Sequence, residues 1–367
     1  MTGRTCLSRV VFVATVALCT VGCLELGPEH VASSQGELLK AAQIKTPSDA
    51  DPSLLRVMSY NIKFGGGRID FFFDGHGEAV HMTAEQVHGN LDALLALVKE
   101  VNPDIWLAQE VDRDSRRSAF VDEAQYILDH SDMNYAAYVY NWRVPFVPDH
   151  GIGQVESGLV VFSKHPLKFP KRIDQGPIGD QDPITERFYL RRAIGQVQVD
   201  FGPGRELSVL NVHTAAYSTD GTKKRQIDQI LAVAKAIKGP VLVGGDFNAV
   251  PPGTTKLEGF ADEKAVLTDE PVHYKGENDW MDPFYSAFNP AIPLVDYQAN
   301  QERYYSHSVD KNVLWTRSID YLFSNLSWNK GGTVLQKPGD TIGGKAITFA
   351  PMKLSDHAPM VAWLLHP

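Results

Sequence analysis

The sequence contains carboxylate, amide and imidazole side chains of the kinds that bind metal ions and phosphates. The set consists of Asn61, Glu110, His213, Asp246, Asn248, Asp320, Asp356 and His357. Carboxylate and amide oxygens are hard ligands that suit Mg²⁺, and histidine transfers protons near neutral pH. Hydrolysis of a phosphate ester needs a cation near the phosphate, a base for the attacking water and a group that stabilises the leaving oxygen. These residue types therefore predict metal-assisted chemistry on a phosphoester.

Several of these side chains lie at the ends of short apolar runs, which we predict to be buried strands. Asn61 follows VMSY, Glu110 follows DIWLAQ, and Asp246 and Asn248 follow VLVGG. Alternate side chains of an extended chain point to the same side, so Asp246 and Asn248 would face one site. The alternative for this pair is an Asx-turn, and for Asn61 a turn in which the side chain bonds the backbone. Polar groups at neighbouring strand ends are expected to converge at one edge of the sheets.

The elements that must carry these side chains are mostly strands. Apolar residues at helical spacing predict two amphipathic helices, over residues 83–101 with Thr83 as N-cap and over residues 223–237. Strands outnumber helices and several follow one another, unlike the strict alternation of a parallel fold. We therefore predict an α/β fold of four layers, in which two packed mixed β-sheets are flanked by helices. The predicted strands cover residues 55–60, 104–109, 158–163, 193–200, 207–212, 241–244, 319–323 and 360–365.

The segments outside these elements divide the chain into three parts. Residues 1–23 are predicted to be a signal peptide, residues 24–53 a polar linker, and residues 54–367 one large domain. Residues 249–318 hold few clear elements and many Pro, Gly and aromatic residues, so long surface loops are expected there.

Seven motifs occur along the chain, and six of them contain the candidate residues. They are SYNIK at 59–63, LAQEVD at 107–112, SGLVVFSKHP at 157–166, LNVHTAAYS at 210–218, GGDFNAVP at 244–251, SIDYLF at 318–323 and LSDHAPM at 354–360. In this order they resemble the endonuclease/exonuclease/phosphatase superfamily, in its sphingomyelinase, DNase I and 5-phosphatase branch. The resemblance spans about residues 55–365. It implies a DNase I-like sandwich and a metal-dependent phosphoric ester hydrolase that uses Mg²⁺, with Mn²⁺ as an alternative ion.

The resemblance also implies a metal site and a water site. Asn61, Glu110 and Asp356 would bind the metal ion. Asp246 would activate or orient the attacking water, and Asn248 would bind a phosphate oxygen. The alternative for Glu110 is a surface carboxylate at a strand end.

Proton transfer and phosphate binding are implied for a second group of residues. His357 would contact the phosphate and act in acid–base catalysis, oriented by Asp320. His213 would donate a proton to the leaving oxygen, and the alternative is a histidine that holds a loop. Arg191 and Arg192 precede the strand at 193–200, and one of them would bind substrate phosphate unless both are structural or solvated.

Other features of the loops carry weaker signals. Lys63 is expected at the solvated surface. The run Phe71-Phe72-Phe73, together with Trp142 and Phe146, would either contact lipid or pack these loops onto the domain.

Charge and cysteine content limit the partners and the redox chemistry. The net charge is −9, whereas proteins that bind nucleic-acid backbones usually carry a basic face. A bound divalent ion would still supply local positive charge. The cysteines are Cys6, Cys19 and Cys23, so residues 24–367 contain no disulfide and no cysteine-based metal site.

The N-terminus has the pattern of an export signal. Arg4 and Arg9 accompany an apolar stretch over residues 10–21, which is short for a transmembrane helix. Thr20-Val21-Gly22-Cys23 resembles a bacterial lipobox, in which Cys23 would be lipidated. We predict an exported protein, either a cell-envelope lipoprotein or a secreted one. Ordinary signal-peptide cleavage nearby and an uncleaved anchor are the alternatives to lipidation.

These observations favour a phosphodiesterase that acts outside the cytoplasm on a phospholipid head group or a small phosphoester, in the manner of sphingomyelinases. It would be a monomer held at the membrane by its lipid anchor. One alternative is an extracellular DNase I-like endonuclease with DNA as its partner. The other is a catalytically inactive binding module that reuses the fold.

Overall fold

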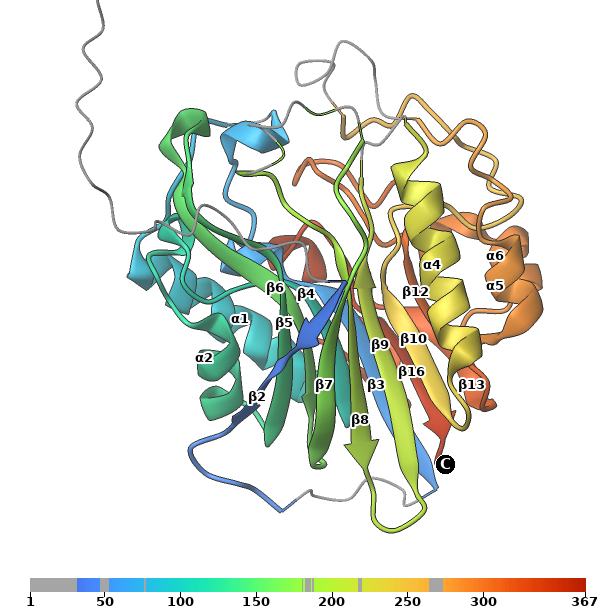
Figure 1. Ribbon diagram of the computed structural model, residues 1–367. Helices are drawn as coiled ribbons and strands as arrows, with labels where there is room; N and C mark the ends of the chain where they lie inside the picture. Colours follow the sequence, from blue (N-terminus) through green and yellow to red (C-terminus); the bar gives the residue numbers. More distant parts are fainter. Residues whose placement is uncertain are drawn as a thin grey trace, which may run out of the picture.

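The computed structural model describes residues 32–46, 53–75, 77–179, 181, 186, 188–216, 220–263 and 273–367. Two seven-stranded sheets pack face to face, with helices on the outside of each (Figure 1). Both sheets are mixed, because β3 pairs with β4 and β9 with β10 in parallel while the other pairs are antiparallel. The predicted four-layer α/β sandwich is therefore confirmed. The predicted signal peptide with Cys23 lies outside the described residues.

The first sheet, called sheet A, has the strand order β1-β7-β8-β9-β10-β12-β11. Its strands are β1 (Ser33–Gln35), β7 (Leu167–Asp174), β8 (Ala193–Asp200), β9 (Glu206–His213), β10 (Val241–Asp246), β11 (Asn289–Pro290) and β12 (Asp320–Ser324).

The second sheet, called sheet B, has the order β13-β16-β3-β4-β6-β5-β2. Its strands are β2 (Glu37–Lys40), β3 (Leu54–Asn61), β4 (Ile105–Asp112), β5 (Tyr135–Val147), β6 (Gly153–Ser163), β13 (Trp328–Val334) and β16 (Met360–Leu365). A separate hairpin joins β14 (Thr341–Ile342) to β15 (Lys345–Ala346).

Helices cover the outer face of each sheet. The outer face of sheet B packs against α1 (Ala84–Val101) and α2 (Glu123–His130), and that of sheet A packs against α4 (Thr222–Ala236) and α5 (Asp282–Ala287). A further helix, α6 (Leu294–Ala299), follows β11. Short 3₁₀ turns are η1 (Lys63–Gly65), η2 (Phe72–Asp74), η3 (Arg116–Ser118), η4 (Asp149–Gly151), η5 (Gln301–Tyr304) and η6 (Pro351–Lys353). In the part of the chain that is described, no helix is long and apolar enough to cross a membrane.

The alternation of apolar residues explains why the strands form two buried interfaces. In β3, Leu55 and Val57 face the core between the sheets, whereas Met58 and Tyr60 face the helices. Apolar residues at both alternating sets of positions are typical of a strand that is buried on both faces. Helix α1 begins as predicted, because Thr83 accepts a hydrogen bond from the backbone N–H of Gln86, whose side chain accepts one from the backbone N–H of Thr83.

The segment predicted as a linker over residues 24–53 requires a correction within its described part. β1 adds to the edge of sheet A beside β7, and β2 adds to the edge of sheet B beside β5. We call residues 33–40 the strap, because they connect the two sheets at one side of the sandwich (Figure 1). At Gly36, where the strap passes between the sheets, a Cβ atom would lie 2.8 Å from Val139 Cγ1, so only glycine fits without displacement.

The segment 249–318 also differs from the long surface loops expected there. Its described residues contain α5, β11, α6 and η5. Tyr297 of α6 and Phe284 of α5 are buried in the cores of the domain. Large aromatic side chains here stabilise the packing of short elements, which have too few residues to show a periodic pattern.

Candidate active site

Three adjacent strands of sheet A place three candidate residues in one row. Asp246 is the last residue of β10 and is opposite His213 on β9 and Asp320 on β12. All three side chains are buried, with exposed fractions of 4% or less. The row arises from the register of the sheet, so the three motifs meet although they are far apart in sequence.

Sheet B brings Asn61 and Glu110 to the same place from the opposite side of the sandwich. The Asn61 Nδ2 atom lies 3.0 Å from Glu110 Oε1 and 3.3 Å from Asp246 Oδ2. The backbone N–H of Lys63 donates to Asn61 Oδ1 at 3.0 Å, which fixes the amide with its N–H groups toward the carboxylates. Asn61 therefore positions two acidic groups, and its predicted direct ligation of a metal stays a prediction.

Glu110 lies at an irregularity of β4 that the sequence did not reveal. The strand continues to Asp112, and its pairing with β6 shifts register between Ala108 and Val111. Glu110 has φ of 55°, in the left-handed region that side chains other than Gly rarely adopt. The bulge turns a partly exposed carboxylate toward the site, a use of local strain that is common at functional positions.

A buried polar contact joins the two sheets below the site. Gln109 Nε2 donates to Asn211 Oδ1 at 2.7 Å, and Asn211 Nδ2 donates to the carbonyls of Ala108 and Val160 at 2.8 and 2.9 Å. Both amide residues are fully buried. This network fixes the position of β4 relative to β9, and hence of Glu110 relative to His213.

His357 lies between two carboxylates. Its Nδ1 is 2.9 Å from Asp320 Oδ2, and its Nε2 is 3.5 Å from Asp246 Oδ2. Burial alone would lower the pKa of His357, but Asp320 and Asp246 outweigh it and raise this pKa to about 10. Burial raises the pKa of Asp246 to about 7, reinforced by Asp320 and opposed by His357. Asp246, Asp320 and His357 lie close enough to hold an ion together, but both ring nitrogens already face carboxylates, so a charge-paired triad explains the cluster better.

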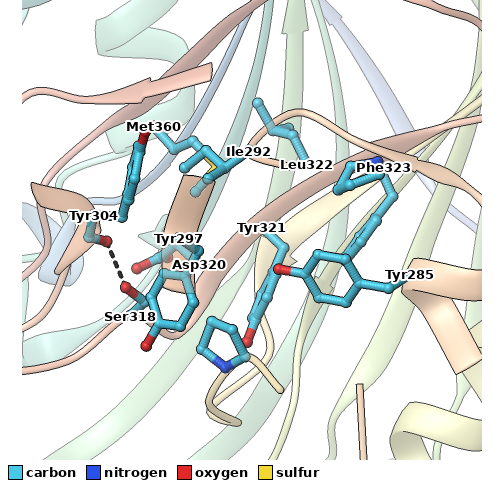
Figure 2. Close-up of a pocket in the computed structure, with 12 residues that line it drawn as sticks. Tyr285, Ile292, Tyr297, Tyr304, Ser318, Asp320, Tyr321, Leu322, Phe323 and Met360 are labelled. Atoms are coloured by element: carbon cyan, nitrogen blue, oxygen red, sulfur yellow. Dashed lines mark hydrogen bonds between the residues drawn. The ribbon is translucent and has the colours of Figure 1, made fainter. Parts of the chain in front are cut away.

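Asp320 also borders a small pocket, with a volume of about 20 Å³ (Figure 2). The pocket is lined by Pro251, Tyr285, Pro290, Ile292, Tyr297, Tyr304, Ser318, Asp320, Tyr321, Leu322, Phe323 and Met360. Asp320 Oδ2 accepts hydrogen bonds from His357 and from Ser306 Oγ, the latter at 2.6 Å. Its other oxygen, Oδ1, is buried and has no hydrogen-bond partner among the described residues. The carboxylate is therefore held entirely through one oxygen.

His213 and Asn248 complete the surroundings of Asp246. His213 Nε2 is 3.3 Å from Asp246 Oδ2, while the buried Nδ1 has no hydrogen-bond partner in the described part of the chain. Burial, with Arg192 and His357 nearby, lowers the pKa of His213 well below its usual value. Asn248, with φ of 47°, donates its backbone N–H to Asp246 Oδ1 at 2.9 Å and its Nδ2 to the carbonyl of Thr214 at 3.1 Å. The D-x-N motif is thus an Asx-type turn that keeps both side chains in the site.

The two neighbouring arginines have different surroundings. Arg191 forms an ion pair with Glu186 at 3.3 Å. Arg192 forms no ion pair with any described residue, and its buried Nε has no hydrogen-bond partner there. The carboxylates of Glu110 and Asp246 interact electrostatically with its guanidinium group. Of the predicted pair, Arg192 is therefore the guanidinium that faces the site.

Lys63, expected at the solvated surface, is instead buried on the far side of Asn61. Its Nζ atom lies 2.6 Å from Asp74 Oδ2 and 3.8 Å from Asp356 Oδ2. Burial tends to raise the pKa of Asp356, but Lys63, His357 and Arg68 lower it below its usual value. The prediction for Lys63 was wrong because its partner Asp74 lies in a loop whose position the sequence does not indicate.

The oxygen donors Glu110 and Asp356 fit a hard divalent ion. Glu110 is partly exposed, and its only hydrogen-bond partner among the described residues is the Asn61 amide. Asp356 accepts one hydrogen bond from Ser355 Oγ, which also donates to the carbonyl of Asn61 at 2.8 Å. Both carboxylates therefore keep lone pairs free for a metal ion such as Mg²⁺, which prefers one or two carboxylates and retains water.

His307 is a site residue that the sequence reasoning missed. Its ring packs edge-on against that of His357, with centroids 4.6 Å apart. Its buried Nδ1 has no hydrogen-bond partner within the described segments. Burial, together with Arg317 and His357, lowers its pKa well below the usual value. No local pattern distinguishes this histidine, because its proximity arises from a bridge between residues 307 and 357.

The aromatic loop residues mostly pack onto the domain. Phe71 is fully buried, and its ring contacts those of Phe64 and Phe73 with centroids 5.0 and 5.2 Å apart. Trp142 donates its indole N–H to the carbonyl of Phe188 at 2.9 Å. Of this group, Phe146 is about half exposed, at 51%.

Two face-to-face mixed sheets with acidic, amide and histidine side chains at one edge define the DNase I-like class of α/β sandwich. Three solved structures of endonuclease/exonuclease/phosphatase proteins share this fold, each with a TM-score of 0.51. The protein from Beutenbergia cavernae is 16% identical, covering 86% of this chain and 72% of its own. The protein from Bacteroides vulgatus is 14% identical, covering 86% and 100%, and that from Leptotrichia buccalis is 15% identical, covering 84% and 99%.

The chain belongs to the Endonuclease/Exonuclease/phosphatase family, whose model matches residues 58–357. The predicted family resemblance is therefore confirmed. A comparison with curated proteins found no match.

Proposed function

We propose that this protein is a Mg²⁺-dependent phosphodiesterase that acts outside the cytoplasm on a phospholipid head group or another small phosphoester. Membership of the family supports hydrolysis of phosphoesters. The observation that carries the proposal is the pairing of His357 with Asp320 and Asp246, next to the Asn61–Glu110 contact. This arrangement supports a site in which a base, a held proton and metal-binding oxygens act together.

Asp246 is the group that accepts a proton from the attacking water. Its Oδ1 is held by the backbone N–H of Asn248 and its Oδ2 by the Asn61 amide. A carboxylate fixed in this way can orient water for in-line attack on phosphorus. As the new P–O bond forms, the water proton moves to Asp246 and the bond to the leaving oxygen breaks.

His357 is the proton donor for the leaving oxygen, because two carboxylates hold its imidazolium. The prediction that His213 performs this step requires a protonated His213, which its burial disfavours. We assign to His213 a hydrogen bond from Nε2–H to Asp246, which stabilises the orientation of that carboxylate.

Arg192 and Asn248 bind the phosphate. The guanidinium of Arg192 forms no ion pair with any described residue, and planar N–H donors suit phosphate oxygens. One N–H of the Asn248 amide is used by the carbonyl of Thr214, which leaves the second for a phosphate oxygen.

Glu110, oriented by Asn61, and Asp356 would hold the metal ion. When bound, Mg²⁺ supplies positive charge that neutralises the phosphate oxygens. Mn²⁺ has similar ligand preferences and is expected to substitute.

Export through the N-terminal segment and lipidation of Cys23 remain part of the proposal, and both lie outside the described residues. Mass spectrometry of the mature protein would identify an acylated Cys23 as the first residue. An unmodified N-terminus downstream of Cys23 would exclude the lipoprotein.

The function is tested with the purified protein and three substrates, each with Mg²⁺ or with EDTA. We expect Mg²⁺-dependent cleavage of bis(p-nitrophenyl) phosphate and of sphingomyelin in vesicles, with little cleavage of plasmid DNA. Cleavage of DNA without cleavage of lipid would favour the extracellular endonuclease. The absence of activity on all three substrates would favour the inactive binding module.

A further inference from the structure

The side chain of Lys63 is a cation built into the acidic site. Its Nζ atom lies 2.6 Å from Asp74 and 3.8 Å from Asp356, the carboxylate assigned to metal binding. The exposed fractions of the three side chains are 4%, 10% and 15%, so little water separates the charges. The ammonium therefore occupies the space that an ion shared by Asp74 and Asp356 would need.

The backbone fixes Lys63 in this position. Lys63 and Phe64 both have positive φ values, of 49° and 42°, within the turn η1. The Lys63 backbone N–H is bonded to Asn61, and its Nζ lies 5.7 Å from the ring centroid of Phe71. A lysine with a strained backbone, an aromatic neighbour and two carboxylate partners is held rather than free to move aside.

The charges around the site accommodate one divalent ion. Five carboxylates, those of Asp74, Glu110, Asp246, Asp320 and Asp356, lie among four cationic side chains, those of Lys63, Arg68, Arg192 and His357. One divalent ion would turn this net charge of minus one into plus one, which a phosphodiester anion neutralises. A second divalent ion would add two uncompensated positive charges in a buried site, which is electrostatically costly.

We propose that Lys63 takes the place of a second metal ion, so that each chain binds a single divalent cation. Lys63 acts as a positioning residue, because it holds Asp356 without contacting the substrate. This inference rests on the proposed metal-dependent function, and it adds the number of ions and the residue that sets it.

The test counts Mn²⁺ ions bound per chain by isothermal titration calorimetry and electron paramagnetic resonance, without substrate. We expect one ion for the wild type and for Lys63→Arg, which keeps the charge. We expect Lys63→Met to bind a second ion, because Asp74 and Asp356 then lose the ammonium group that pairs with both of them. Lys164→Met is the matched control, since Lys164 is equally buried and pairs with Asp104 at 3.0 Å, at the opposite end of β4 from Glu110. It should bind one ion.

The wild-type titration decides the inference even if Lys63→Met does not fold. Two ions bound to the wild type would overturn the role of Lys63 and leave the metal-dependent function in place. A folded Lys63→Met protein that still binds one ion would also overturn it. If the wild type bound no Mn²⁺, the proposed function itself would fail, and this inference with it.

Discussion

Replacing Asp320 with Asn removes one negative charge from the triad while keeping the shape of the side chain. In the wild type, Asp320 Oδ2 accepts hydrogen bonds from His357 and Ser306. An asparagine oxygen in that position could keep both. Its amide nitrogen would then replace Oδ1, which receives no hydrogen bond from any described residue. The change thus removes the negative charge of the His357 partner and takes away no hydrogen bond.

The magnitude follows from the loss of a charge-assisted hydrogen bond. Such bonds contribute about 1.5–3 kcal/mol and an asparagine oxygen keeps part of this, so if the bond stabilises the transition state, kcat should fall by at most about 150-fold. The pKa of His357, raised to about 10 against the effect of burial, should fall because Asp320 is the carboxylate that raises it most. Both kcat and the pKa of His357 should therefore be lower in Asp320→Asn than in the wild type.

The assay combines kinetics on bis(p-nitrophenyl) phosphate with an NMR titration of His357. Ser306→Ala serves as the control, because it removes a hydrogen bond given by an uncharged donor to the same oxygen and keeps the charge of Asp320, so the pKa of His357 should stay raised. Thermal melting establishes that both variants are folded. The reasoning would be refuted if Asp320→Asn kept kcat within about threefold of the wild type while the pKa of His357 fell.

Four further predictions concern other parts of the molecule. Arg192→Ala should raise KM about 10- to 100-fold, whereas Arg191→Ala should leave it nearly unchanged, and equal effects in steady-state kinetics would contradict the assignment. Glu110→Gln should weaken Mn²⁺ binding at least about tenfold in calorimetry, and unchanged affinity would exclude Glu110 as a ligand. Burial, reinforced by Asp112, raises the pKa of Glu123 well above its usual value, so its contribution to stability is present below about pH 4 and is lost as the pH rises toward the folded-state pKa. The free energy of unfolding in urea should therefore fall with rising pH more steeply for the wild type than for Glu123→Gln, and parallel slopes would argue against this. Gly36→Ala should destabilise the fold by about 1–3 kcal/mol in urea titrations, because its Cβ would contact Val139, and a stability equal to that of the wild type would show that the strap can shift.

The sequence was most informative where function and regular structure coincide. Asn61, His213 and Asp246 end apolar strands, and those strands formed where short apolar runs predicted them. Both the layers of the fold and the meeting of these residues follow from such local patterns. The motif order supported the same family that the family model confirms.

The features that were missed depend on contacts between distant residues. The bulge at Glu110 and the burial of Lys63 arise from backbone turns with positive φ at residues that are not glycine, which composition does not reveal. The approach of His307 to His357 depends on a bridge across 50 residues of chain. Choosing between Arg191 and Arg192 required knowing that Glu186 pairs with the first.

The strap also has a mechanical consequence for a tethered protein. If Cys23 carries a lipid, the residues from there to the start of β1 can span at most about 35 Å, so one side of the sandwich must stay near the membrane surface. A pull on that tether would first load the hydrogen bonds of β1 to sheet A, and Gly36 and β2 would pass the load to sheet B. Force on the anchor would thus reach both sheets at their shared edge. The two sheets, which carry Glu110 and Asp246, would therefore move together as one rigid body.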